Sequence, residues 1–144
     1  MFKNIVVAFI TKKVKEKPFF VGLGLAKAFD GNVTIIECVY KKPPKLIFFE
    51  TKEDLRSVEQ QKKVAKKSLY RFEELAKRSG MKIKTKIALT ESIAEWMVDY
   101  VKEHRTDLLI LDHPHLSEFE ENHYDYIIQT INHKVKVPVL LLRS

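Results

Sequence analysis

The hydrophobic positions of this chain fall into five short apolar runs separated by segments with helical spacing. The runs predict β-strands at Lys3–Phe9, Asn32–Tyr40, Lys82–Leu89, Asp107–Asp112 and Val137–Leu142. The intervening segments predict helices at about residues 18–29, 52–79, 91–104 and 121–133. Strands that alternate with helices along one chain indicate parallel pairing through right-handed crossovers, with helices on both faces of the sheet. The pattern therefore predicts an α/β domain.

The strands differ in how completely they are apolar. The first, fourth and fifth runs are almost continuously apolar, which is typical of strands that are covered on both faces. Residues 82–87 instead alternate between polar and apolar side chains. One face of this strand is therefore expected to meet solvent, and we expect it to lie at or near an edge of the sheet.

Residues that favour helix ends agree with these boundaries. Asp30–Gly31 and Ser79–Gly80 follow predicted helices, and each glycine can adopt the left-handed conformation that ends a helix. Thr90 is the expected N-cap of the third helix. Gly22 and Gly24 lie within a predicted helix and not in a strand-to-helix turn, so close helix–sheet packing is favoured over dinucleotide binding.

The composition is that of a folded protein, because 45% of the 144 residues are apolar and 31% are charged. We expect one domain spanning residues 1–144. The single cysteine, Cys38, lies in a strand pattern, so we expect no disulfide within the chain and an inert apolar role. The first residues do not form a signal peptide pattern, and no apolar run approaches the ~18 residues of a membrane helix. These features predict a cytoplasmic protein without membrane partners.

The net charge of +7 is unevenly distributed, because residues 41–86 carry 15 basic and 6 acidic groups and residues 87–144 carry 5 and 10. A basic segment of this kind can meet an anionic partner, but no compact recognition motif is present. We therefore favour a solvated, lysine-rich helix over nucleic-acid binding. Within the basic segment, Leu46–Phe49 is an apolar stretch in a loop and is expected to cover the sheet or a second subunit.

Four segments, in order along the chain, resemble the universal stress protein family. Phe2–Val7 is similar to the first strand of that family, and residues 25–36 are similar to its first helix and second strand. Thr106–Ile110 resembles the family's Ala-Asp-Leu-Ile-Val segment, and Pro138–Leu142 resembles its final strand. The resemblance covers essentially the whole chain. It implies a three-layer α/β/α sandwich with a five-stranded parallel sheet of order 3-2-1-4-5, an adenine-nucleotide α-hydrolase-like fold.

The resemblance also implies a homodimer. In this strand order the fifth strand lies at an edge, and an unprotected apolar edge favours pairing with another chain. Members of the family commonly dimerise through this strand. We therefore expect an interface that includes Val137, Val139 and Leu141.

The family's ATP-binding motif is absent. Members that bind ATP carry Gly-x-x-Gly and, after a spacer, Gly-Ser or Gly-Thr, together with an aspartate at the end of the first strand. The corresponding pocket positions in this chain are Ile10, Thr11, Val39, Asp112, His115, Asp125 and Tyr126. One carboxylate ~4 Å from a phosphate charge costs about 4 kcal/mol at an effective dielectric constant of ~20. The resemblance therefore implies a degenerate pocket that does not bind ATP in the family's usual way.

The segment from Asp112 to Asp125 is rich in side chains that bind metals. His113, His115 and His123 are candidate ligands for Zn²⁺ or a related ion together with a carboxylate. No strict ligand spacing is present, and acidic residues before a helix also stabilise its N-terminus without a metal. No catalytic triad or nucleophile elbow is present.

Three functions remain open from the sequence. The first is a non-catalytic, dimeric protein of stress response or regulation that uses no cofactor. The second is a sensor that binds a nucleotide or another small anion through basic residues of the segment 41–67. The third is a metal-assisted hydrolase at the Asp112–Asp125 loop.

Overall fold

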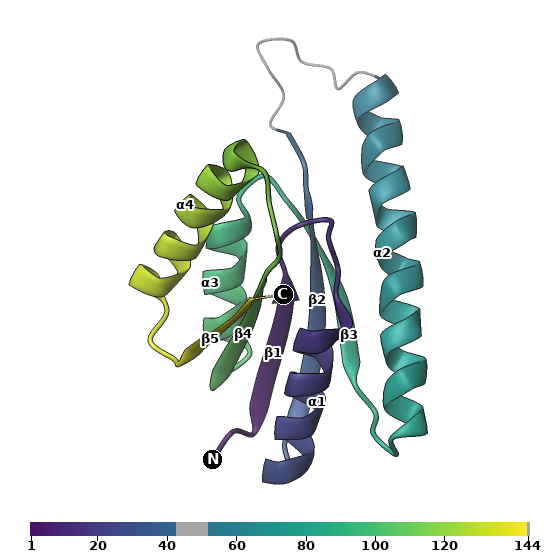
Figure 1. Ribbon diagram of the computed structural model, residues 1–144, viewed down its shortest axis with the longest axis vertical. Helices are drawn as coiled ribbons and strands as arrows, with labels where there is room; N and C mark the ends of the chain where they lie inside the picture. Colours follow the sequence, from purple (N-terminus) through teal and green to yellow (C-terminus); the bar gives the residue numbers. More distant parts are fainter. Residues whose placement is uncertain (43–51, 144) are drawn as a thin grey trace.

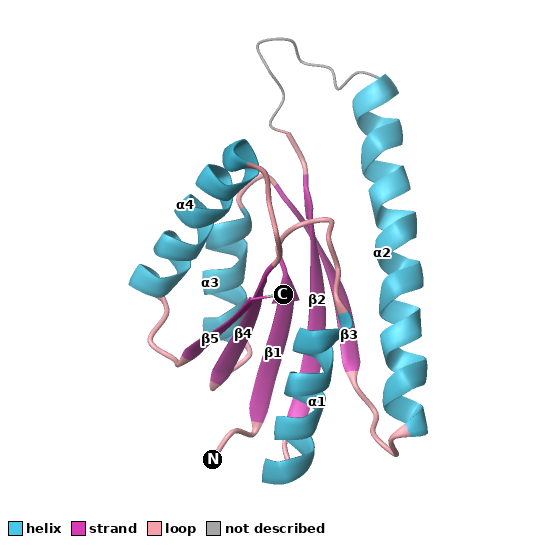
Figure 2. Ribbon diagram, viewed as in Figure 1, coloured by secondary structure: helices cyan, strands magenta, loops and turns pink. Residues whose placement is uncertain are grey.

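The computed structural model describes residues 1–42 and 52–143 and shows strands and helices that alternate along the chain (Figures 1 and 2). The strands are β1 (Asn4–Phe9), β2 (Asn32–Tyr40), β3 (Lys84–Thr90), β4 (Leu108–His113) and β5 (Val139–Arg143). The helices are α1 (Glu16–Phe29), α2 (Lys52–Arg78), α3 (Ile93–Glu103) and α4 (Glu118–Lys134). Each predicted element is therefore present, with ends shifted by at most a few residues. Leu46–Phe49, the loop that is expected to cover the sheet or a second subunit, lies outside the described residues.

All five strands are parallel and follow the order β3-β2-β1-β4-β5, which confirms the predicted sheet. In the central strand, Val7 pairs with Ile35 of β2 on one side and with Ile110 of β4 on the other. The alternating strand β3 lies at one edge and β5 at the opposite edge, as expected. The connections from β1 and β4 lead in opposite directions, so the carboxyl ends of these two strands form the switch point at which sheets of this kind have a ligand-binding crevice.

Alternate residues of β1 face two separate apolar layers, which confirms the three-layer sandwich. Val7 and Phe9 are buried with side chains of α1 and α2, whereas Val6 and Ala8 are buried with side chains of α3 and α4. Figure 1 shows α3 and α4 together on one side of the sheet and α1 and α2 on the other. Burial of alternate residues on both faces explains why this strand reads as a continuous apolar run.

Gly22 brings α1 close to the centre of the sheet. A Cβ atom at this position would lie 2.4 Å from Cγ2 of Val7, which is itself fully buried. The predicted packing role is therefore confirmed for Gly22. It is wrong for Gly24, because a Cβ atom there would meet nothing within 4 Å.

Two predicted helix caps are wrong. Asp30, with φ of 52°, is the left-handed residue at the end of α1, whereas Gly31 is needed because a Cβ atom there would lie 2.4 Å from the carbonyl oxygen of Phe2. Ser92 is the N-cap of α3, and the Thr90 hydroxyl instead accepts a hydrogen bond from the Ser92 N–H at 3.0 Å. The left-handed glycine predicted after α2 is confirmed, because Gly80 has φ of 74°.

Asp107, which precedes β4, forms hydrogen bonds with the backbone at the beginning of β1. Its carboxylate accepts hydrogen bonds from the backbone N–H groups of Lys3 at 2.8 Å and Asn4 at 3.0 Å. Its own N–H donates to the carbonyl oxygen of Asn4 at 2.9 Å. These contacts give the Asp of the Thr106–Ile110 segment a structural role at the end of the sheet opposite the crevice.

Candidate functional site

The crevice lies at the carboxyl ends of β1 and β4, where this topology places ligand sites. Ile10 follows β1 directly, and its side chain is buried in the core on the α3–α4 side. Asp112 and His113 end β4 and are also buried. An apolar side chain therefore stands at the end of β1, where ATP-binding members of the resembled family carry an aspartate. A carboxylate and an imidazole stand at the end of the neighbouring strand β4.

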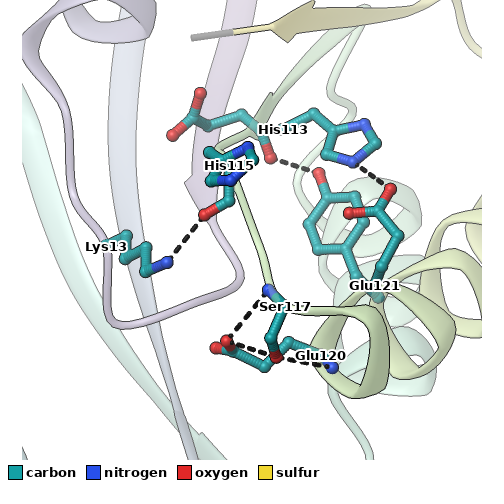
Figure 3. A network of polar contacts seen from close by, with 8 residues as sticks. Lys13, His113, His115, Ser117, Glu120 and Glu121 are labelled. Carbon is teal, nitrogen blue, oxygen red and sulfur yellow. Dashed lines mark hydrogen bonds and ion pairs between the residues drawn. The ribbon is translucent and has the colours of Figure 1, made fainter.

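A lysine connects the two loops that border the crevice. The ammonium of Lys13, from the segment between β1 and α1, donates to the carbonyl oxygen of His115 at 2.6 Å (Figure 3). The side chain of His115 is exposed. The Lys13–His115 contact therefore joins the β1–α1 and β4–α4 segments through the backbone of His115.

The N-terminus of α4 is closed by a capping box. The Ser117 hydroxyl oxygen accepts the Glu120 N–H at 3.3 Å, and the Glu120 carboxylate accepts the Ser117 N–H at 3.2 Å and its hydroxyl at 2.8 Å (Figure 3). The helix begins at Glu118, before the predicted residue 121, because this reciprocal pair satisfies amide groups that would otherwise lack partners. Asp125 and Tyr126 lie within α4, and the Tyr126 side chain is exposed.

Carboxylates carry negative charge to the same helix end. Glu118, Glu120 and Glu121 occupy the first turn of α4, where the helix dipole stabilises an anion. The hydrogen bonds from the Ser117 side chain and backbone, with a smaller effect of the Lys13 charge, lower the pKa of Glu120. A helix N-terminus of this kind could otherwise bind a phosphate. Here, the first turn carries three carboxylates of the protein itself.

His113 is fixed by two neighbours from α4. Its Nε2 lies 2.6 Å from Oε1 of Glu121 (Figure 3). Its ring stacks on Tyr124 with a centroid separation of 4.7 Å. The Tyr124 hydroxyl donates to the carbonyl oxygen of Asp112. Burial raises the pKa of Tyr124 above its usual range, and the nearby carboxylates, first that of Asp112, raise it further. Tyr124 is therefore a neutral donor that holds the end of β4 against α4.

The structure brings one of the three predicted metal-ligand histidines together with carboxylates. His113, Glu121 and Asp125 each offer a ligand atom, and these atoms lie within 4.8 Å of one another. His123 instead faces Tyr40, at 6.3 Å between ring centroids. His115 lines the same hollow of about 450 Å³ as His113 and Glu121, but within the described residues it does not join the ligand group.

The remaining predicted pocket residues, Thr11 and Val39, line a different cavity of about 350 Å³. This cavity lies between β2, the segment after β1, and α2, and it contains Glu37. Glu37 is 5% exposed, and Ser68 forms a hydrogen bond with its side chain. Burial raises the pKa of Glu37 to about 7, although the Ser68 hydrogen bond opposes this shift.

Glu37 was not among the predicted site residues. The sequence does contain a signal for it, because Glu37 is the one charged residue in the segment Val33–Val39. Apart from Glu37 and Thr34, this segment is apolar. The adjacent Cys38 faces the opposite layer and is buried, as expected. Burial, with a smaller contribution from the charge of Glu37, raises the pKa of the Cys38 thiol to about 12, so the thiol stays protonated and inert.

Glu37→Gln is expected to remove a pH-dependent loss of stability. The folded protein holds the Glu37 proton more tightly than the unfolded chain, because burial raises the pKa from 4.5 to about 7. Stability therefore falls as the pH rises through this interval. One pKa unit corresponds to about 1.4 kcal/mol, and with a discount for solvent screening beside the cavity we expect a loss of about 1–2 kcal/mol.

Urea unfolding at about pH 5 and pH 8 measures this effect. The wild type should lose about 1–2 kcal/mol more than Glu37→Gln over this interval. Equal losses for the two proteins would show that the Glu37 carboxyl titrates in the folded protein as it does in the unfolded chain.

The fold and the crevice define an α/β protein of the kind that places ligand sites at the carboxyl ends of parallel strands. The sequence pattern of the Universal stress protein family matches residues 1–143, and the chain belongs to this family. A comparison with curated proteins gives no match.

Solved structures of universal stress proteins share the fold. The chain is 16% identical to UspA from Lactobacillus plantarum, with a TM-score of 0.78, and the match covers 99% of this chain and 98% of that one. It is 13% identical to a universal stress protein from Archaeoglobus fulgidus in complex with dAMP, with a TM-score of 0.64 and 98% of both chains covered. An Arabidopsis thaliana family protein with AMP bound is 16% identical, with a TM-score of 0.64, and 98% of this chain and 91% of that one are covered.

Proposed function

We propose that this protein is a non-catalytic, cytoplasmic protein of stress response or regulation that does not bind ATP in the family's usual way. The observation that carries the proposal is the closed N-terminus of α4. The Ser117–Glu120 capping box binds the Glu120 N–H of the first turn, and the same turn carries the side chains of Glu118, Glu120 and Glu121. Some structural relatives carry dAMP or AMP, so loss of nucleotide binding would be a property of this chain within the family.

The physical basis is repulsion between like charges. A triphosphate that approached this helix end would meet Glu118 and Glu121 in addition to Glu120. At an effective dielectric constant of ~20, one carboxylate ~4 Å from a phosphate charge costs about 4 kcal/mol. This cost corresponds to a loss of affinity of about a thousandfold. The buried side chain of Ile10 also lacks the carboxylate that the family's ATP binders keep at this position.

Thermal unfolding with ATP tests the proposal and separates it from the two alternatives. A ligand at 100 times its dissociation constant adds about 2.7 kcal/mol to the stability of the protein it binds. We expect no increase in melting temperature with millimolar ATP and Mg²⁺. An increase with ATP, with or without Mg²⁺, would contradict the proposal and support a nucleotide sensor.

Metal binding at His113, Glu121 and Asp125 is the second candidate, because these side chains converge within 4.8 Å. Three protein ligands with an open position suit a Zn²⁺ ion that activates water, which is the chemistry of a metal-assisted hydrolase. The melting experiment includes Zn²⁺ alone for this reason. Stabilisation by Zn²⁺ that Asp125→Asn removes would support this candidate, and the absence of stabilisation would count against it.

The proposal includes a homodimer paired through β5. This strand bonds only to β4 within the described sheet, so its outer edge is available to a second copy. Leu140 and Leu141 are 36% and 37% exposed on this strand. Val137 and Val139 are partly buried against the α3–α4 core, so the exposed leucines offer the larger apolar area.

A further inference from the structure

The cavity beside Glu37 contains a buried acceptor that lacks a partner. Oε2 of Glu37 has almost no exposed surface and no hydrogen-bond partner among the described residues. The residue is more than nine-tenths buried, and it is one of the residues that line the cavity of about 350 Å³ between β2 and α2. An unpaired buried acceptor is costly, so a group that donates to it from within the cavity would be bound favourably.

The walls of this cavity suit a small organic molecule. Val39 of β2 and Val64 and Ala65 of α2 provide apolar surface, and Gln60 and Gln61 add polar groups from the same helix. The volume is at the lower end of the roughly 300–1,000 Å³ that is typical of ligand sites. A compact ligand with an apolar body and one strong donor group therefore fits better than a large polar one.

The charges favour a cationic donor. Among the described residues, Glu37 and Lys12 are the charged ones that line the cavity, and Glu37 is buried whereas Lys12 is exposed. Solvent screens the exposed ammonium, but it screens the buried carboxylate much less. A cation inside the cavity would therefore feel the attraction of Glu37 more strongly than the repulsion of Lys12.

We propose that this cavity binds a small organic cation with a flat apolar body, whose amidine or amine group pairs with the Glu37 carboxylate. The two N–H groups of an amidine match the two oxygens of a carboxylate, which makes this the best geometry for the pair. The valines then cover the apolar body. The site differs from the β4–α4 crevice, and the proposal holds whether or not ATP binds there.

Benzamidine is the probe that tests this inference, with benzamide as its neutral analogue of the same shape. Titration calorimetry of the full chain at about pH 8 keeps Glu37 ionised, because burial raises its pKa only to about 7. We expect benzamidine to bind the wild type at least about tenfold more tightly than benzamide. Glu37→Gln should weaken benzamidine binding by about tenfold or more, since it keeps the size of the side chain but removes the charge.

Glu59→Gln is the matched control, because it makes the same charge change on α2 at an exposed side chain outside the cavity lining. This variant should bind benzamidine as the wild type does. Absence of benzamidine binding by the wild type, or equal affinity of the wild type for benzamidine and benzamide, would overturn the proposal. Equal affinity of wild type and Glu37→Gln would also overturn it. If Glu37→Gln does not fold, the benzamidine-to-benzamide ratio of the wild type decides alone.

Discussion

Gly22→Ala lowers the free energy of unfolding by about 2 kcal/mol, whereas Gly24→Ala raises it by up to about 1 kcal/mol. Both glycines lie in α1, and alanine is the better helix former at either position. At Gly22, the added Cβ would lie 2.4 Å from Cγ2 of Val7, a side chain locked at the centre of the sheet. Relieving this overlap requires a shift of helix or sheet, and the cost exceeds the gain in helix propensity.

Urea unfolding of the two variants and the wild type measures both effects. Gly24→Ala is the control, because its added Cβ would meet nothing within 4 Å and its backbone change is the same. Equal stability changes at the two positions would mean that α1 moves away from β1 without cost. The close approach of α1 would then not be a fixed feature of this fold.

Leu141→Lys is expected to convert a dimer of twice the 16.9 kDa chain mass into a monomer. Leu141 lies on the edge strand β5, and its side chain is 37% exposed in the single chain. Pairing of two β5 edges would bury this side chain in each copy. A lysine there would place two like charges near the symmetry axis and would remove apolar contact area, and charged side chains oppose pairing at edge strands.

Light scattering at micromolar concentration gives the mass directly. Leu55→Lys is the matched control, because Leu55 is 48% exposed on α2, away from β5. This variant should remain a dimer. A monomeric wild type, or a dimer that survives Leu141→Lys, would contradict an interface through β5.

The layered fold could be predicted from the sequence because each strand and helix follows from a local pattern. Residues 82–87 alternate between polar and apolar side chains, and β3 is found at an edge. The strand order could not be predicted from local patterns, because it depends on contacts between segments that are distant in the sequence. The resemblance to the family implies this order. The start of α4 was placed too late, although Ser117 and Glu120 have the spacing of a capping box.

The site could be predicted only in part, because its contacts join residues that are far apart in the sequence. Lys13 and His115 are separated by 102 positions, and nothing in either local pattern indicates their hydrogen bond. The cavity beside Glu37 needs α2 to lie across β2, which also arises only in the folded chain. By contrast, the absence of glycine between β4 and α4 is visible in the sequence itself.

The central proposal concerns the carboxyl end of the sheet, where this topology places ligand sites. At this end of the sheet lie the buried side chain of Ile10, the Lys13–His115 contact and the capping box at Ser117. Ile10 follows β1, the Lys13–His115 contact joins the β1–α1 and β4–α4 segments, and the capping box lies at the N-terminus of α4. We propose that these side chains together leave no place for the phosphates of ATP in this member of the family.

Titration calorimetry of ATP with Mg²⁺ into the purified protein at neutral pH tests this claim most directly. If carboxylates at the α4 N-terminus exclude the phosphates, the dissociation constant lies above about 1 mM, a binding free energy weaker than about −4 kcal/mol. A saturable heat with a dissociation constant in the micromolar range would contradict the account. It would show that ATP binds despite Glu118, Glu120 and Glu121.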